Sequence, residues 1–276
     1  MADILTTKAR GSIAKTRAGS IDEIQPVRLG LVCNDNALSR QAGLYQQQFG
    51  FERLRIPPGS GFYLLYSIQG LALCQHGASP IWVDFVAGAM GHRRRFGGGR
   101  GQPLARAMGM KPGFNPAICD ATAGLGRDGF VLASLGSRVT LCERSPVLAA
   151  LLADGLQRAA LDAEISDWVA QNLKLESTDS SDWLDAVDEA QRPDVVYMDP
   201  MYPPGKSKVL VKKEIRALQQ LLGPDRDSSR LLEIARQTAQ RRVVVKRPKR
   251  ADWLAGEKPS TSIESKKTRY DVYVTL

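Results

Sequence analysis

Two short segments carry residue types that could bind a ligand and do chemistry. The first, Asp120-Ala-Thr-Ala-Gly-Leu-Gly-Arg-Asp-Gly, follows an apolar run and precedes a helical pattern. In this context Gly124 and Gly126 let the backbone approach a nucleotide-like ligand closely. Nineteen residues after Gly124, Glu143 ends the next apolar run, where a carboxylate can accept both hydroxyls of a ribose. The pattern predicts a site for an adenosine-containing cofactor and leaves NAD and S-adenosylmethionine open; a tight turn that only packs the helix is the alternative.

The second segment, Asp199-Pro-Met-Tyr-Pro-Pro, follows the apolar run 195–198. Its first four residues resemble the (N/D)PP(Y/F) motif of methyltransferases that act on exocyclic amines of bases, with Met201 in place of the second proline. Such an amine is a poor nucleophile because its lone pair is delocalised into the ring. Hydrogen bonds to the Asp199 carboxylate and the Pro200 carbonyl would localise and aim that lone pair, and Tyr202 can stack on the base. We predict Asp199, Pro200 and Tyr202 as catalytic residues; the alternative is a proline-rich turn with Tyr202 as packing.

Both segments need a sheet to position them, and beyond residue 112 apolar strands alternate with helical patterns. This alternation is typical of an α/β fold with a doubly wound, mostly parallel sheet. Ligands bind such sheets at the carboxyl ends of the strands, near the point where the strand order reverses, so both segments should face one cleft. The predicted strands are 117–122, 138–143, 194–198, 243–246 and 270–276, and the predicted helices are 128–135, 145–161, 209–222 and 230–240.

The chain before this sheet predicts a small α+β domain at 26–88, with the sheet domain at 89–276. Strands are expected at 29–32, 62–68, 71–75 and 81–85, and a helix at 37–49. Residues 1–25 are rich in alanine, serine, threonine and glycine and show little apolar periodicity. We expect them to form a mobile extension.

The composition excludes several classes of protein. With 276 residues, 43% of them hydrophobic and 24% charged, the chain should fold around a real core. No run reaches the roughly 18–20 apolar residues of a membrane helix, and no signal peptide is evident, so we expect a soluble, unexported protein. Cys33, Cys74, Cys119 and Cys142 form no CxxC pair and should be buried free thiols in a reducing compartment. With only two histidines, no metal site and no histidine-based catalysis are expected.

The net charge of +9 is unevenly distributed. Residues 85–119 hold six basic residues and no acid, 206–216 hold a net +4, and 241–250 hold six basic residues, so the rest of the chain is acidic. Clustered basic charge is expected of a protein that binds a phosphate backbone, although a solvated surface is the alternative. The predicted RNA-binding residues are Arg93, Arg94, Arg95, Arg100, Lys206, Lys208, Lys212, Lys246 and Arg247.

Six separated blocks, in order, resemble the ribosomal RNA small subunit methyltransferase J family. They are VDFVAGAMGHRRRFGGGRGQPLARA, DATAGLGRD, CERSPVLAALLADGL, VVYMDPMYP, VKKEIRALQQLLGPD and VVVKRP. The resemblance runs from about residue 80 to the C-terminus. It implies a cytoplasmic enzyme with a seven-stranded sheet that uses S-adenosylmethionine to methylate N2 of a guanine near the 3′ end of 16S rRNA, as naked RNA or in the small ribosomal subunit.

The resemblance also implies which residues contact the cofactor. Together with the glycine loop they are Asp120, Gly124, Gly126, Arg127, Asp128, Glu143, Arg144, Ser181, Asp182 and Asp199. Two other readings remain open at this point. A non-catalytic RNA-binding or ribosome-assembly factor would show the same basic segments. An NAD-dependent oxidoreductase would share the glycine loop, but this sequence lacks the catalytic side chains that such enzymes usually have.

Overall fold

The computed structural model describes residues 29–87, 90–91, 93, 98–201, 213–223, 225 and 227–275. Several residues singled out above lie outside this part of the chain. They are the predicted extension 1–25 and Arg94, Arg95, Tyr202, Lys206, Lys208 and Lys212.

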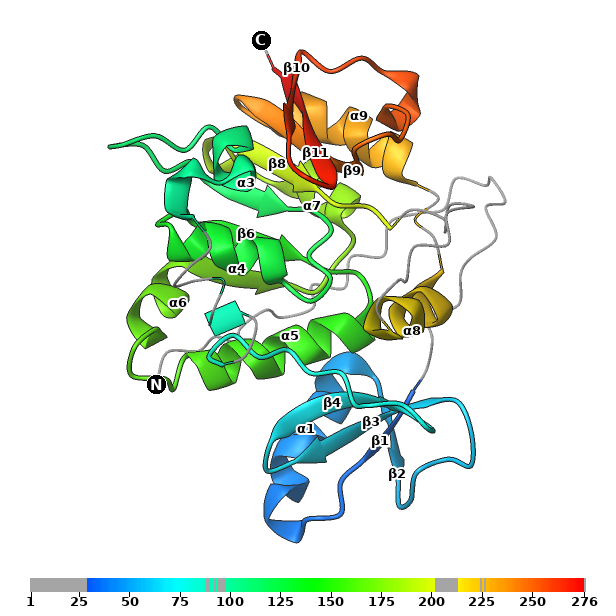
Figure 1. The fold of residues 1–276 in the computed structure, drawn as a ribbon. Coiled ribbons are helices and arrows are strands. Elements are labelled where there is room, and N and C mark those ends of the chain that lie inside the picture. Colours follow the sequence, from blue (N-terminus) through cyan, green and yellow to red (C-terminus); the bar gives the residue numbers. More distant parts are fainter. Residues whose placement is uncertain are drawn as a thin grey trace.

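A seven-stranded sheet forms the centre of the larger part of the molecule (Figure 1). Its strands are β5 (Ile118–Asp120), β6 (Val139–Cys142), β7 (Leu173–Glu176), β8 (Val195–Met198), β9 (Arg242–Pro248), β10 (Thr261–Glu264) and β11 (Thr268–Val274), in the order β10-β11-β9-β8-β5-β6-β7. All neighbours run parallel except β11, which is antiparallel to both β9 and β10. This arrangement confirms the predicted fold class. The strand order reverses at β5, which lies between β6 and β8.

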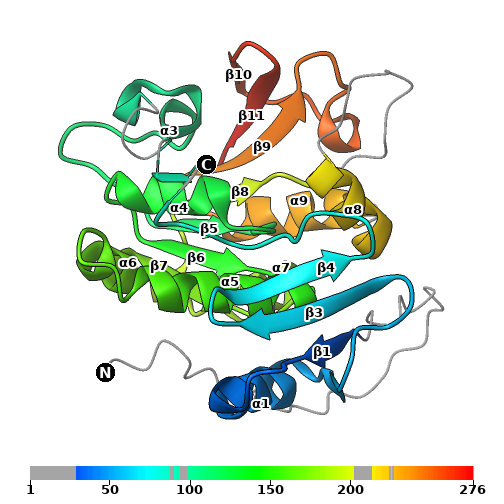
Figure 2. The ribbon, with the colours of Figure 1, turned by 60° about the horizontal axis from the view of Figure 1, so that its bottom comes forward.

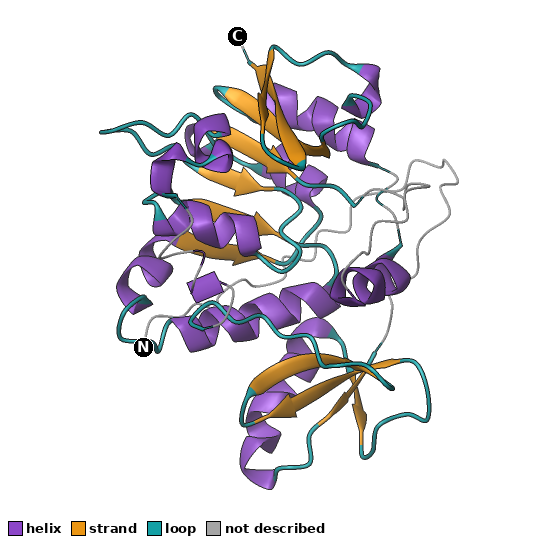
Figure 3. Ribbon diagram, viewed as in Figure 1, coloured by secondary structure: helices purple, strands orange, loops and turns teal. Residues whose placement is uncertain are grey.

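Helices cover both faces of this sheet (Figure 3). One face packs against α4 (Arg127–Ser134), α5 (Pro146–Ala159) and α6 (Ser166–Asn172), and the other against α7 (Ser180–Ala186) and α9 (Ser228–Thr238). The alternation of side chains along each strand separates the two cores: Tyr197 joins the α4 side, and Met198 joins the α9 side. As predicted, Ser145 caps α5 by accepting from the Leu148 N–H, with Pro146 at the first helical position. Two further helices are α3 (Pro103–Ala107) and α8 (Lys213–Leu222).

A second, four-stranded sheet with one helix precedes the large sheet. It consists of β1 (Gly30–Val32), α1 (Ser39–Phe49), β2 (Glu52–Leu54), β3 (Phe62–Ser67) and β4 (Gly70–Gln75), with strand order β2-β1-β3-β4. Figures 1 and 2 show that α5 lies between this unit and the large sheet, and α5 contacts both α1 and β4. The Tyr45 hydroxyl donates to Gln157 of α5 at 3.0 Å across this contact. The helix predicted at 37–49 corresponds to α1, because Ala42, Tyr45 and Phe49 lie one turn apart on one buried face.

The sequence prediction differs from the structure in several elements. The strand expected at 81–85 is wrong, because only Ile81 forms an isolated bridge, with Leu73. Five short elements of the large domain were not predicted, namely α3, α6, β7, α7 and β10, and neither was β2. The four cysteines are buried free thiols, as expected. Within the described residues, no helix is long and apolar enough to cross a membrane, and no cluster of side chains is suited to holding a metal ion.

Candidate active site

A cavity of about 880 Å³ opens at the carboxyl ends of β5, β6 and β8. Its walls include Gly124, Glu143 and Asp199, so the two segments identified from the sequence face one cavity. The arrangement follows from the topology: β5 lies between β6 and β8, and parallel strands place their carboxyl ends at the same edge. Other predicted site residues on the walls are Arg93, Asp120, Arg127, Asp128, Arg144, Ser181, Pro200 and Lys246.

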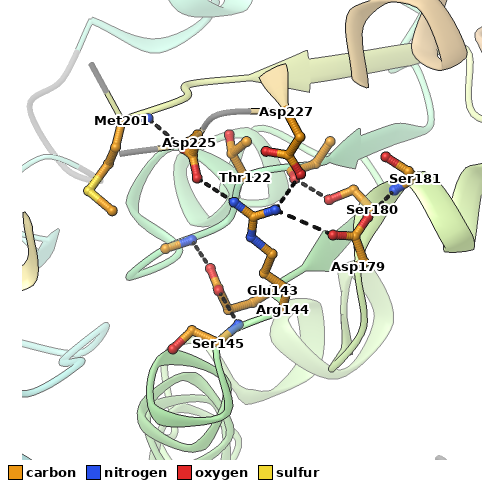
Figure 4. Close-up of polar contacts among 12 residues, drawn as sticks. Thr122, Glu143, Arg144, Ser145, Asp179, Ser180, Ser181, Met201, Asp225 and Asp227 are labelled. Carbon is orange, nitrogen blue, oxygen red and sulfur yellow. Dashed lines mark hydrogen bonds and ion pairs between the residues drawn. The ribbon is translucent and has the colours of Figure 1, made fainter. Parts of the chain in front are cut away.

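Two backbone hydrogen bonds hold the Glu143 carboxylate in place (Figure 4). Oε2 accepts from the Gly124 N–H at 2.8 Å, and Oε1 accepts from the Ser145 N–H at 2.7 Å. Burial raises the pKa of Glu143 to about 7 against these hydrogen bonds, and Asp225 acts in the same direction as burial. Each carboxylate oxygen retains acceptor capacity, so the side chain can still accept hydroxyls of a ligand in the cavity.

The two glycines of the loop have different roles. Both adopt left-handed backbone conformations, with φ of +56° at Gly124 and +69° at Gly126. A Cβ at Gly124 would meet nothing closer than 3.8 Å, so this position leaves open space in the cavity wall. A Cβ at Gly126 would lie 2.6 Å from Leu152 and 3.1 Å from Phe85. Gly126, predicted as a cofactor contact, is therefore required for packing and is not among the residues that line the cavity.

Arg144 joins three carboxylates at one rim of the cavity, as Figure 4 shows. Its guanidinium lies 2.7 Å from Asp225, 2.5 Å from Asp227 and 3.5 Å from Asp179. Asp225 also accepts the Met201 N–H at 2.7 Å, so it connects Arg144 to the segment that carries Asp199. None of these three aspartates was predicted from the sequence.

Asp199 belongs to a second charged network of the cavity, centred on Lys246. Its Oδ2 lies 2.7 Å from the Lys246 ammonium, and its N–H donates to Thr122 Oγ1 at 2.6 Å. Lys246 also donates to Asp128 at 2.8 Å, and Asp128 accepts from the Tyr197 hydroxyl at 2.7 Å. Burial raises the pKa of Asp199, and Lys246 acts in the opposite direction.

The pKa values of the other groups in this network follow from the same pairing. Arg93, another predicted RNA contact, lies 2.8 Å from Asp128. Burial alone would raise the pKa of Asp128, but Lys246 and Arg93 outweigh it and lower the pKa to about 2. Burial alone would lower the pKa of Lys246, but Asp199 and Asp128 raise it well above its usual value. Asp128 and Lys246 therefore stay charged at neutral pH.

Comparison with known proteins identifies the family. Residues 46–275 match a family model described as "Putative SAM-dependent methyltransferase". The ribosomal RNA small subunit methyltransferase J of Aeromonas hydrophila is 57% identical over 88% of this chain and 97% of its own length. That of Colwellia psychrerythraea is 47% identical over 99% of this chain and 97% of its own length. The chain belongs to this methyltransferase family.

A solved structure agrees with this membership. The SAM-dependent methyltransferase from Neisseria gonorrhoeae is 38% identical, has a TM-score of 0.73, and is matched over 89% of this chain and 96% of its own. The enzyme is therefore a methyltransferase with S-adenosylmethionine as cofactor, as the resemblance predicted. The reading as an NAD-dependent oxidoreductase is excluded.

The residues of the cavity fit this cofactor. Gly124 leaves open the space that a side chain would fill, and Glu143 next to it offers acceptors for hydroxyl groups. Among the residues that the structure describes, seven carboxyl groups and four basic side chains line the cavity. An excess of carboxyl groups suits S-adenosylmethionine, because its sulfonium gives it a net positive charge near neutral pH.

Of the pair Ser181 and Asp182, predicted to contact the cofactor, the structure places only Ser181 at the cavity. Ser181 lines the cavity, whereas Asp182 is exposed and does not. The carboxylate that does line the cavity is Asp179, which caps α7 by accepting the Ser181 N–H at 2.8 Å. The chain enters the first turn of α7 at Ser180, so the three residues before Asp182 face the cavity and Asp182 points away.

Two of the predicted RNA contacts are placed elsewhere. Arg247 is buried on the α9 side of the sheet, where it donates to the Asp252 carbonyl, because neighbouring strand residues face opposite ways. Arg100 is exposed but donates to the carbonyls of Lys111 at 3.1 Å and Leu135 at 3.2 Å. Leu135 follows the C-terminal end of α4, and the cavity lies at the N-terminal end of that helix. Arg100 therefore does not line the cavity.

Proposed function

We propose that this methyltransferase transfers a methyl group from S-adenosylmethionine to the exocyclic N2 of a guanine in 16S rRNA. One observation carries the proposal: Glu143, suited to a ribose, and Asp199, suited to an amine, line one cavity. A non-catalytic RNA-binding or assembly factor would have no reason to keep both groups in one place. The relatives are named as small-subunit rRNA methyltransferases, which favours the same substrate class.

Each wall of the cavity has a separate role in holding the cofactor. Glu143 would hold the ribose hydroxyls, and the open backbone at Gly124 would accommodate the methionine portion. Ser181 and the Asp179 carboxylate would hold the adenine. When bound, the cofactor supplies a methyl group on a positively charged sulfur, which needs no strong base to activate it. The protein residues therefore act mainly by positioning, which can supply a large part of the rate enhancement.

Asp199 and Pro200 act on the base. The carboxylate and the Pro200 carbonyl accept hydrogen bonds from the N2 amine and direct its lone pair at the methyl group. Tyr202, which lies outside the described residues, would stack on the base and hold it in line. The methylated amine is acidic enough to release its proton to Asp199 or to water.

The basic segments of the sequence would hold the RNA by its phosphates. Of the predicted contacts, Arg94, Arg95, Lys206, Lys208 and Lys212 keep this assignment as proposals. Phosphate contacts give affinity with little sequence information, so the choice of base would come from the cavity. We place the reaction in the bacterial cytoplasm, on 16S rRNA or on the small subunit.

Mass mapping of methylated guanine in 16S rRNA tests the proposal, in cells that lack the protein and carry either wild type or Asp199→Ala. We expect Asp199→Ala to reduce methylation about 100-fold or more, since it removes an acceptor that acts on the reacting amine. Its affinity for S-adenosylmethionine by calorimetry should stay within roughly tenfold of wild type. Asp182→Ala, on an exposed residue outside the cavity, is the matched control and should behave as wild type.

Two results would contradict the proposal. Methylation by Asp199→Ala at the wild-type rate would remove Asp199 from the reaction. If the folded wild-type protein gave no heat with S-adenosylmethionine and left the guanine unmethylated, the assembly-factor reading would be correct.

A further inference from the structure

Lys246 is a predicted RNA contact that the structure places at the centre of a charged network in the cavity. It lies on β9, faces the α4 side of the sheet, and its side chain is only 24% exposed. Its ammonium is 2.7 Å from Asp199 Oδ2 and 2.8 Å from Asp128 Oδ2. An ammonium bound to two carboxylates within a cavity is poorly placed to hold a phosphate outside it.

Asp128 fixes the position of the ammonium. Asp128 lies in the first turn of α4 and is itself held by the Tyr197 hydroxyl at 2.7 Å and by Arg93 at 2.8 Å. Tyr197 is 1% exposed, so this support is part of the packed core. The Lys246 ammonium therefore sits at a defined place, and Asp199 is oriented by a group that is anchored independently of it.

We propose that Lys246 is a positioning residue for methyl transfer: it binds one oxygen of the Asp199 carboxylate and leaves the other oxygen to the guanine amine. This inference rests on the function proposed above. Among the described residues no hydrogen bond reaches Asp199 Oδ1, and the side chain is 40% exposed, toward the cavity. A lysine held in this way fixes the carboxylate without blocking its free side.

The charge of Lys246 also matters, because Asp199 lies among other acids. Asp120 on β5, Asp128 on α4 and Asp225 before α9 all act on it, and Lys246 is the cation that opposes them. Tyr197 and Tyr270 also belong to this cluster, and Arg93 reaches it through Asp128. Guanine presents two neighbouring donors, N1–H and the N2 amine, which suit an ionised carboxylate. A protonated Asp199 would instead present a donor to them.

Lys246→Met removes the ammonium, and Lys246→Arg keeps the charge. Lys174→Met is the matched control, since Lys174 is a 70% exposed lysine paired with Glu176 on β7 of the same sheet. Three measurements are made on the full-length protein: single-turnover methylation of 16S rRNA against pH, the pKa of the Asp199 carboxyl by ¹³C NMR, and the salt dependence of rRNA binding. Affinity for S-adenosylmethionine is measured alongside.

We expect Lys246→Met to raise the pKa of Asp199 by about 1–3 units, the usual effect of losing an opposite charge at contact. The acid limb of the profile of methylation rate against pH should move to higher pH by the same number of units, and the rate at pH 7 should fall about tenfold or more. Affinity for the cofactor and the salt slope of RNA binding should not change. Lys246→Arg should recover most of the rate, and Lys174→Met should match wild type.

Other outcomes would overturn the inference. An unchanged rate profile and Asp199 pKa in Lys246→Met would show that Lys246 does not act through Asp199. A salt slope reduced by about one, with an unchanged pH profile, would return Lys246 to the phosphate contacts predicted from the sequence. If Lys246→Met does not fold, Lys246→Gln serves in its place. Failure of the proposed function is distinguishable, since wild type itself would then leave the rRNA unmethylated.

Discussion

Replacing Gly124 and Gly126 by alanine, one at a time, should separate cofactor binding from folding. Both changes put a Cβ on left-handed backbone, which costs about 1–2 kcal/mol. At Gly126 the new Cβ would also lie 2.6 Å from Leu152 and 3.1 Å from Phe85, which are 0% and 1% exposed. Overpacking of this kind adds about 1–3 kcal/mol. The total for Gly126→Ala is then about 2–5 kcal/mol, whereas Gly124→Ala stays near the backbone cost alone.

Urea unfolding followed by circular dichroism measures the two stabilities, and calorimetry with S-adenosylmethionine measures binding by the folded variants. We expect Gly124→Ala to lose more cofactor affinity than stability, because its Cβ would occupy the open space in the cavity wall. Gly126→Ala should be the less stable protein. Equal destabilisation of the two variants, or wild-type cofactor affinity in Gly124→Ala, would refute the division of roles between these glycines.

Two further predictions concern pH and the cavity rim. Burial raises the pKa of Asp120 to about 8 and of Glu143 to about 7, so the free protein binds more protons folded than unfolded. Its free energy of unfolding should therefore fall as pH rises from about 4 to 8, and a urea midpoint that rises across this window would contradict the assignment. Arg144→Ala should reduce methylation more than it reduces stability. Without Arg144, Asp225 loses its ion pair, and its hydrogen bond to the Met201 N–H would no longer fix the segment that carries Asp199. Since Arg144 is 43% exposed, a stability loss well above about 1 kcal/mol would be unexpected.

The parts of the site that were predicted correctly depend on strand ends. Glu143 and Asp199 each follow a short apolar run, and such runs in an alternating pattern predict neighbouring parallel strands. The carboxyl ends of those strands then meet at one edge, whatever the details of the loops. For this reason residues 23 and 79 positions after Asp120 can be assigned to one cleft from the sequence alone.

The parts that were missed depend on short or polar elements. Asp179 follows β7, whose four residues give too little alternation to be recognised. Asp225 ends one of the blocks that carry the family resemblance, but nothing in its local sequence indicates a role in the site. Their pairing with Arg144 is a tertiary contact that no local pattern encodes. The separation of Lys246 from Arg247 is accessible in principle, since strand geometry places neighbours on opposite faces. The predicted strand ends at residue 246, so Lys246 and Arg247 are assigned to one basic surface. In the structure β9 pairs with β11 as far as Pro248, so these two neighbours face opposite sides of the sheet.

The described residues of the cavity walls are richer in acids than the chain as a whole, and this difference bears on how the substrate enters. A chain of net charge +9 attracts a polyanion, yet carboxyl groups outnumber basic side chains among the described residues of the cavity walls. The net charge of the chain draws phosphates to the surface, while an uncharged base can enter the cavity. Entry would need the guanine to leave its stack, as in other enzymes that modify bases. The carboxylates of the lining then favour the cationic cofactor, and under the proposed function the RNA backbone would stay outside while the base reaches Asp199.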